Sequence, residues 1–390
     1  MPRVGVPIGD WILDLSVLEA EGFFAEILGS NSSLFAQRYL NSFMAKGKEV
    51  WSSIRAIIHD LLRDENPRLR DDLVLRIRAL KRAKEARLLL PVQIGDYTDF
   101  YSSRKHATNV GKMFRGEENA LPANWLHLPI AYHGRASSVM VSGTPVYRPS
   151  GQILSKKSDN PIFAESAALD YELEMGFFIG PGSQIGKPIS LKDAKEHIFG
   201  MVLVNDWSAR DIQKWEYQPL GPFLGKNFAT TISPWIVTME ALEPFRCEGP
   251  VQEPKPLPYL QNAGHRSYNI NLEVEIKTQN MENGQKICRS NSKFLYWDVY
   301  QQLAHHSVNG CNLRTGDLLA SGTISGPAKD SFGSLLETTW QGSKPVELSG
   351  GEERRFLEDG DSVIMTGWCQ GDDYRIGFGE AAGTIYPANR

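Results

Sequence analysis

The sequence has few cysteines, and none of them forms a pair of the metal-binding or redox type. Cys247, Cys288, Cys311 and Cys369 are the four cysteines, each more than twenty residues from the next. A zinc ribbon or a thioredoxin-like site needs a Cys-x-x-Cys spacing, so the sequence argues against both. Such sparse cysteine usage is typical of a protein in a reducing, cytosolic environment.

Long hydrophobic runs and a strong charge of either sign are also missing. No apolar stretch approaches the roughly 18 residues of a membrane span, and Asp10 and Asp14 leave no room for the apolar core of a signal peptide. The net charge of the 390 residues is only -4, which gives no overall field for nucleic acid or an anionic membrane. We therefore expect a cytoplasmic globular protein that binds neither nucleic acid nor membrane.

The sequence does contain a large apolar fraction, 41% of its residues, and its length favours at least two domains. In the first part, apolar residues recur every three or four positions, as at Trp51 and Ile58, which predicts a helix that Pro67 ends. A second helix should open near 71–72, and we expect Leu73 and Ile77 to lie on its apolar face. We interpret the many basic residues around it as a solvated helix face.

The pattern changes near residue 90, where short strands and turns replace helical spacing. We therefore expect an α+β fold, mainly β, with one domain over 1–90 and a second over 91–390. Residues 169–178 alternate with period two, which predicts a strand that carries Glu172 and Glu174 on one face. A helix over 208–217 should place Arg210, Gln213 and Tyr217 along one side.

The most chemically varied stretch is 95–109, in which Phe100 is the only large, purely apolar side chain. It is too polar for a core element, and we interpret it as the wall of a site. His106 follows Asp99 and Tyr101 and suits a general base, because imidazole titrates near neutral pH. A lone histidine is more often structural, so the pattern leaves both interpretations open.

Glu172 and Glu174, with Asp99 and Asp206 after neighbouring apolar runs, offer the oxygen ligands that a hard cation prefers. The alternative is a solvated sheet face. The same Glu-x-Glu spacing recurs at residues 273 and 275, where it reads most simply as solvated. Spacing alone therefore favours the solvated face and leaves the metal site as a hypothesis.

Arg210, Gln213 and Lys226 are donors suited to a developing oxyanion, although each is equally an ordinary surface residue. The glycine-rich segment 221–226 lacks the Gly-x-x-x-x-Gly-Lys-Ser/Thr spacing of a phosphate-binding loop, which argues against that function.

Taken together, several blocks of this sequence resemble the fumarylacetoacetate hydrolase family. They are residues 96–104, 106–109, 132–135, 172–174, 205–211 and 321–327. The resemblance implies an N-terminal SH3-like barrel with helices, which starts later here and is expected to be incomplete, and a C-terminal mixed β-roll. It also implies a homodimer that hydrolyses the β-diketo acid 4-fumarylacetoacetate to fumarate and acetoacetate, the last step of tyrosine and phenylalanine breakdown.

The resemblance also assigns roles to single positions of this sequence. The implied metal ligands are Asp99, Glu172, Glu174 and Asp206, with a second, Mg²⁺-type position at Asp206, Lys226 and Thr230. The implied catalytic residues are the general base His106, its partner Glu337, and the oxyanion donors Arg210, Gln213 and Lys226. The implied substrate contacts are Tyr101, Arg115, Tyr217 and Thr323. Oxygen ligands suit Ca²⁺ and Mg²⁺ alike, so the expected cofactor is either or both.

Two rival functions remain at this point. An acylpyruvate hydrolase or an oxo-acid decarboxylase would share the metal carboxylates but lack the environment of Tyr101 and Arg115. A structural or binding dimer would bind metal without turnover.

Overall fold

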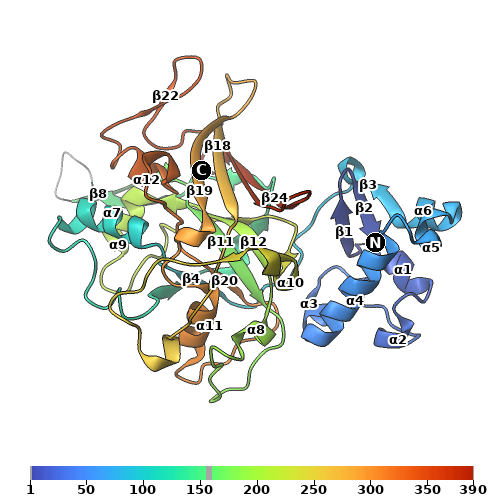
Figure 1. The fold of residues 1–390 in the computed structure, drawn as a ribbon. Helices are drawn as coiled ribbons and strands as arrows, with labels where there is room; N and C mark the ends of the chain where they lie inside the picture. Colours follow the sequence, from blue (N-terminus) through green and yellow to red (C-terminus); the bar gives the residue numbers. More distant parts are fainter. Residues whose placement is uncertain (1, 155–159, 390) are drawn as a thin grey trace.

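The computed structural model describes residues 2–154 and 160–389 and shows a mixed α+β protein that is mainly sheet (Figure 1). Its largest sheet has eight strands, ordered β5-β4-β20-β11-β12-β14-β6, with β15 paired to β12. These strands are β4 (Tyr97–Phe100), β5 (Ala131–His133), β6 (Val139–Val141), β11 (Leu173–Ile179), β12 (Ile198–Asp206), β14 (Thr230–Ile232), β15 (Val237–Thr238) and β20 (Leu318–Ala320).

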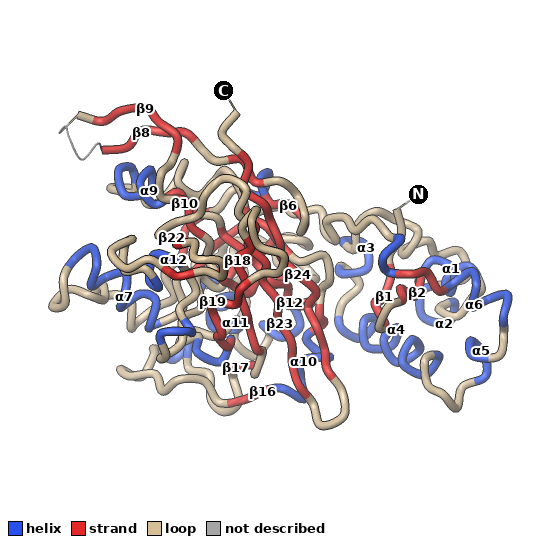
Figure 2. The backbone as a smooth tube through the Cα atoms, turned by 90° about the horizontal axis from the view of Figure 1, so that it is seen from above, coloured by secondary structure: helices blue, strands red, loops and turns tan. Residues whose placement is uncertain are grey.

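A second sheet of five strands covers one face of this central sheet, and Figure 2 shows the strands of both running through the same body. Its strands are β7 (Val146–Tyr147), β18 (Asn271–Lys277), β19 (Gln285–Asn291), β23 (Ser362–Gln370) and β24 (Arg375–Tyr386). Met175 and Leu203 of the central sheet share one hydrophobic core with Val274, Met365 and Phe378 of this second sheet.

Short elements complete the larger part of the chain. Four strand pairs are β8 (Ser150–Leu154) with β9 (Pro161–Glu165), β10 (Leu169–Asp170) with β13 (Ser208–Ala209), β16 (Arg246–Cys247) with β17 (Ser267–Tyr268), and β21 (Val346–Glu347) with β22 (Glu353–Arg354). The helices are α7 (Arg104–Arg115), α8 (Ala194–His197), α9 (Arg210–Glu216), α10 (Met239–Leu242), α11 (Val299–Ser307) and α12 (Leu335–Thr338). Helix α9 confirms the helix predicted over 208–217. Within the described ranges, no helix has both the length and the apolar character needed to cross a membrane.

The N-terminal part, blue in Figure 1, combines a small antiparallel sheet with six helices. The sheet has the order β1-β2-β3, and the SH3-like barrel expected for this part is not confirmed. Its elements are β1 (Gly5–Ile8), β2 (Trp11–Asp14), β3 (Leu80–Arg82), α1 (Leu15–Ala20), α2 (Ala25–Leu28), α3 (Asn41–Met44), α4 (Lys48–Leu61), α5 (Pro67–Arg70) and α6 (Leu73–Ala79).

Two local predictions in this part were wrong. Pro67 does not end the helix α4, which stops at Leu61; it begins α5, because a proline suits the first turn of a helix. Helix α6 buries Leu75, while Leu73 and Ile77 are each 66% exposed. Both faces of this short helix carry apolar residues at i, i+4 spacing, so periodicity could not tell which face meets the core.

The N-terminal helices cover the other face of the central sheet. Trp51 of α4 packs edge-on against Phe199 of β12 with ring centroids 5.0 Å apart, in one core with Phe178 and Val202. The central strands are therefore apolar on both faces, as in sheets that are covered on both sides. This packing covers Phe178 at the far end of β11, on the face that also carries Glu174. The proposed domain boundary at residue 90 remains a prediction.

Replacing Trp51 by alanine should lower the free energy of unfolding by about 3–5 kcal/mol, the usual loss for a large buried aromatic side chain. The indole also donates a hydrogen bond of 3.1 Å to the carbonyl of Phe43. Urea denaturation measures the loss. An unchanged midpoint would show that α4 does not contribute to the packing of the central sheet.

Candidate active site

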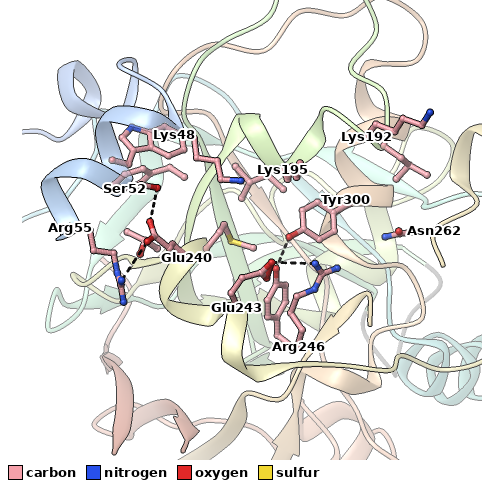
Figure 3. Close-up of a pocket in the computed structure, with 17 residues that line it drawn as sticks. Lys48, Ser52, Arg55, Lys192, Lys195, Glu240, Glu243, Arg246, Asn262 and Tyr300 are labelled. Atoms are coloured by element: carbon pink, nitrogen blue, oxygen red, sulfur yellow. Dashed lines mark hydrogen bonds and ion pairs between the residues drawn. The ribbon is translucent and has the colours of Figure 1, made fainter. Parts of the chain in front are cut away.

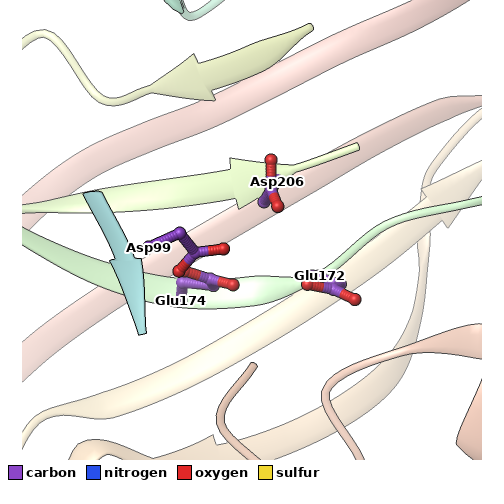
Figure 4. Close-up of side chains that lie close together, drawn as sticks. All are labelled: Asp99, Glu172, Glu174 and Asp206. Atoms are coloured by element: carbon purple, nitrogen blue, oxygen red, sulfur yellow. The ribbon is translucent and has the colours of Figure 1, made fainter. Parts of the chain in front are cut away.

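Four buried carboxylates meet at one end of the central sheet (Figure 4). Asp99 lies on β4, Glu174 on β11, Asp206 ends β12, and Glu172 comes directly before β11. One oxygen of each lies within 4.8 Å of the others. The strand register produces this convergence, because Ala320 pairs with Asp99 on one side, and the amide of Asp206 donates to the carbonyl of Glu172 at 3.2 Å.

Two buried cations neutralise one half of this cluster. Glu172 accepts hydrogen bonds of 2.6 Å from Arg210 Nη1 and 2.6 Å from Lys226 Nζ. Lys226 also donates to Asp206 at 2.7 Å. Burial acts to raise the pKa of Glu172, but the charges of Lys226 and Arg210 outweigh it and hold that pKa below its usual range. Despite burial, Asp206 and Glu172 hold the pKa of Lys226 above its usual range.

The other half of the cluster, Asp99 and Glu174, has no cation partner among the described residues. Both accept from the amide of Gly322, at 3.2 and 3.1 Å, and the Oε1 atom of Glu174 is buried without a partner. Burial and the neighbouring carboxylates raise the pKa of Asp99 and of Glu174 well above the ordinary values. Gly322 has φ +76°, and a Cβ there would lie 2.3 Å from the carbonyl oxygen of Phe100, so only glycine fits.

These observations fit a hard divalent cation. The donor set is entirely oxygen, it is buried, half of its charge is uncompensated, and one carboxylate oxygen lacks a partner. The interpretation of Glu172 and Glu174 as a solvated face was wrong. Glu273, on β18, shows the contrast, because it faces Lys286 at 2.8 Å in an ordinary surface ion pair.

The raised pKa values of Asp99 and Glu174 predict how ion binding depends on pH. A carboxyl whose folded-state pKa is raised favours folding below its unfolded-state pKa, and this contribution is lost as the pH rises through the folded-state value. A cation must displace these protons. We therefore expect Ca²⁺ to raise the Tm more at about pH 8 than at about pH 6, with proton release on binding. Calorimetry in buffers of different ionisation enthalpy measures that release, and pH-independent binding without it would contradict the expectation.

A histidine–glutamate pair forms the second part of the site. His106 lies in the first turn of α7, which Ser103 caps, and its Nδ1 is 2.6 Å from Oε2 of Glu337 on α12. Asn109 donates to Oε1 of Glu337 at 2.8 Å, and Ser325 donates to Oε2 at 2.7 Å. Although burial acts to raise it, the pKa of Glu337 is lowered by His106 and these donors. An ionised Glu337 accepts the proton on Nδ1 and so leaves Nε2 free to take another.

Helix α9 supplies the hydrogen-bond donors. Arg210 begins the helix, and its Nη1 also donates to Oε1 of Gln213 at 3.2 Å, so the two side chains point the same way. Gly225 lets the loop that carries Lys226 approach this helix, because a Cβ there would lie 2.7 Å from Cβ of Gln213. The structure thus brings Arg210, Gln213 and Lys226 together, as the resemblance implied.

The four expected substrate contacts differ in how clearly they border the cluster. The ring of Tyr101 packs edge-on against His106 at 5.4 Å, and burial raises the pKa of its hydroxyl against the opposing charge of Arg115. Thr323 is buried with an unpartnered hydroxyl oxygen. Arg115 is exposed and donates to the carbonyls of residues 119 and 120. Tyr217 is half-buried after α9 and accepts only from the neighbouring side chain in the described contacts.

The second metal position borders a cavity of about 160 Å³ that Asp206, Lys226, Thr230 and Tyr132 help to line. Thr230 donates to Oδ1 of Asp206 at 3.1 Å, and Tyr132 donates to Oδ2 at 2.9 Å. The ammonium of Lys226 has no lone pair, so only its backbone carbonyl could ligate an ion. This second position remains a prediction.

A larger cavity, of about 390 Å³, lies between α4 and the segment around α8 and α10 (Figure 3). Its two carboxylates are already paired: Glu240 lies 3.5 Å from Arg55, and Glu243 lies 3.4 Å from Arg246. The unneutralised carboxylates and the histidine–glutamate pair lie elsewhere, so we place the candidate active site at the acidic cluster and not in this larger cavity.

Sequence reasoning did not find several residues that build the site. Asp170 binds Arg210, while Asn109 and Ser325 bind Glu337. Asp170 lies two residues before Glu172 and so continues the alternation of Glu172 and Glu174. The sequence did contain this signal. Asn109 lies three residues after His106 and shares its helix face. We see no sequence pattern that marks Ser325.

The fold and this site define the chain as a member of the fumarylacetoacetate hydrolase family. The family model described as Fumarylacetoacetate (FAA) hydrolase C-terminal matches residues 96–385, and the Fumarylacetoacetase N-terminal model matches residues 1–91. The chain is 59% identical to the fumarylacetoacetase of Bos taurus and 58% identical to that of Homo sapiens, in each case over 99% of this chain and 92% of the relative. It is 52% identical to the fumarylacetoacetase of Arabidopsis thaliana over the same shares.

Solved structures show the same fold at low identity. A fumarylacetoacetate hydrolase from Exiguobacterium antarcticum superposes with a TM-score of 0.54 at 17% identity, over 99% of this chain and 95% of the other. A maleylpyruvate hydrolase from Sphingobium sp. SYK-6 gives a TM-score of 0.52 at 16% identity, over 99% and 96%. At this identity the likeness supports the fold alone.

Proposed function

We propose that this protein hydrolyses the carbon–carbon bond of 4-fumarylacetoacetate to give fumarate and acetoacetate, the last step of tyrosine and phenylalanine breakdown. The observation that carries this proposal is the pairing of His106 with Glu337 beside a four-carboxylate cluster, in a chain 59% identical to a named fumarylacetoacetase. Asp99, Glu172, Glu174 and Asp206 would hold a Ca²⁺ or Mg²⁺ ion. When bound, such an ion supplies Lewis acidity for a carbonyl oxygen.

The residues of the chain supply the remaining steps. His106 takes a proton from water at Nε2, and the hydroxide adds to the fumaryl carbonyl carbon to give a tetrahedral alkoxide. Arg210, Gln213 and Lys226 donate to the oxygen that gains charge, and one such donor is typically worth about 10²- to 10³-fold. The carbon–carbon bond then breaks, its electron pair leaves with the acetoacetate part, and the imidazolium of His106 returns the proton to that carbon.

The ionised Glu337 has two functions in this scheme. It fixes the proton on Nδ1 of His106 at 2.6 Å, so that Nε2 faces the water as an acceptor. It also stabilises the imidazolium that forms when the base is protonated.

Substrate recognition is assigned to residues around this centre. We propose that Thr323 uses its unpartnered hydroxyl for the substrate and that Tyr101, which packs on His106, borders the reacting carbon. Arg115 and Tyr217 would meet the carboxylate ends of the diketo acid as donors.

Turnover of a panel of 2,4-diketo acids by the purified protein tests the proposal. Loss of enol absorbance with fumarate as a product is the expected result, with fumarylacetoacetate the best substrate by kcat/KM. Faster turnover of acylpyruvates would favour the rival hydrolase function. Tight ion binding without turnover of any diketo acid would favour a binding protein.

We also propose a cytoplasmic homodimer with an SH3-like N-terminal domain. The four cysteines, all unpaired, support a reducing location. Light scattering coupled to size exclusion is expected to give twice the chain mass of 43.6 kDa, whereas a single chain mass would contradict the dimer.

A further inference from the structure

We propose that Asp170 is a positioning residue. Its buried carboxylate fixes the His106–Glu337 pair and the oxyanion donor Arg210 relative to each other. This inference rests on the proposed function, because it concerns the geometry of the same reaction. Asp170 is fully buried at the end of β10, outside the four-carboxylate cluster. Its partners lie on two different catalytic elements.

On one side, Asp170 holds the guanidinium of Arg210. Oδ2 accepts from Nε of Arg210 at 2.9 Å, and Nη2 lies 2.8 Å from the same oxygen. Two contacts from one carboxylate oxygen fix the direction of the planar guanidinium. This direction lets Nη1 reach both Glu172 at 2.6 Å and Gln213 at 3.2 Å.

On the other side, Asp170 holds the start of α12. Oδ1 accepts from the amide of Leu335 at 2.8 Å, and Oδ2 accepts from the amide of Leu336 at 3.0 Å. Helix α12 has only four residues, and a helix this short does not hold its shape without tertiary contacts. Its third residue is Glu337, which binds His106. The position of the base therefore depends on what anchors these amides.

The carboxylate of Asp170 thus contacts both the oxyanion donor Arg210 and the helix that carries Glu337. Both partners lie far from Asp170 in the sequence, because Leu336 is 166 positions after it and Arg210 is 40 positions after it. Because a misplacement of about 1 Å can cost about 10²-fold in rate, loss of this anchor should lower kcat without removing any group that contacts the substrate.

The test is Asp170→Asn, which keeps the shape but turns one acceptor oxygen into a donor facing Arg210 or α12. We expect kcat for fumarylacetoacetate to fall about 10- to 100-fold, with KM within about threefold. A second variant, Asp170→Glu, keeps the charge for the contact with Arg210 but is one methylene longer and displaces α12. It should show the same kcat loss, so the inference can be judged even where Asp170→Asn folds poorly.

The matched control is Asp298→Asn. Asp298 is also a buried aspartate, 3% exposed; it caps α11 through the amides of Tyr300 and Gln301, each at 3.0 Å, and faces Arg266 at 3.5 Å. It shares the burial, the capping and the arginine contact of Asp170, but its described partners are not site residues. We expect a lower Tm with kcat within about twofold of the wild type.

Two measurements distinguish a positioning role of Asp170 from a contribution to stability alone. In a Glu337→Gln background, Asp170→Asn should lower kcat by a smaller factor than it does in the wild type, because the part of its effect that passes through Glu337 is already lost while the part through Arg210 remains. The downfield proton resonance of the His106–Glu337 hydrogen bond should be lost in Asp170→Asn and kept in Asp298→Asn. Full additivity with Glu337→Gln, or an Asp170 variant with a lower Tm, normal kcat and an unchanged resonance, would overturn the inference. An inactive wild type would instead refute the proposed function, and the resonance would still decide the role of Asp170.

Discussion

Replacing His106 by alanine is expected to lower kcat for fumarylacetoacetate by about 10²- to 10⁴-fold, the usual contribution of a general base. The reason is that His106 is the imidazole whose Nδ1 proton is fixed by Glu337, at 2.6 Å, which leaves Nε2 as the acceptor. Glu337 keeps Asn109, Ser325 and Ser334 as donors in the variant, so the fold should persist. Steady-state kinetics and circular dichroism check both statements.

His197 provides the control for this variant. Its Nδ1 lies 2.8 Å from the carbonyl of Pro181, at the end of α8, so it is a partly buried histidine with a structural contact. The variant His197→Ala should keep kcat within about twofold. If His106→Ala retained near-normal turnover, the assignment of the base would be wrong.

Replacing Glu174 by glutamine is expected to weaken binding of Ca²⁺ or Mg²⁺ by at least about 10²-fold and to lower turnover at least in proportion. Glutamine keeps the shape of glutamate but removes its charge and places an amide where Oε1, the unpartnered oxygen, now lies. Titration calorimetry measures the ion affinity without any reference to turnover.

The chain contains its own control for this variant in Glu275→Gln. Glu275 belongs to the second Glu-x-Glu strand, β18, and is only partly buried. The Glu275→Gln variant should bind the ion and turn over substrate as the wild type does. Equal ion affinity in Glu174→Gln and wild type would show that the four carboxylates are not the ion site.

The comparison of these two strands shows how far the sequence could predict the site. Glu172 and Glu174 have the same spacing as residues 273 and 275, yet only the first pair is buried beside further carboxylates. Alternation reports which side chains share a face, but the burial of that face depends on what packs on it. Here Arg210 and Lys226 pack on Glu172, and the amide of Gly322 contacts Glu174, so groups from distant parts of the chain cover this face. The resemblance to the family, and not the spacing, favoured a buried acidic cluster at Glu172 and Glu174 over a solvated face.

The mainly β character and some of the longer elements followed from the sequence because their apolar residues are strongly periodic. Helix α4 and strand β11 are examples, with Trp51 and Ile54 buried on α4 and Leu173 and Met175 buried on β11. The buried face of α6 could not be predicted, because both of its faces are apolar. Contacts between residues distant in the chain could not be predicted from sequence patterns either. His106 and Glu337 are 231 positions apart, and only the fold brings them together.

The central claim is that one divalent ion is held by the four carboxylates beside His106. A crystal structure of the protein with bound Mn²⁺ or Ca²⁺, located by anomalous scattering, tests it most directly. The account predicts one ion within about 2.0–2.6 Å of oxygens from Asp99, Glu172, Glu174 and Asp206, with Nε2 of His106 facing the open side of its coordination shell. An ion bound elsewhere in an enzyme that turns over fumarylacetoacetate, with these four carboxylates free of it, would contradict the account.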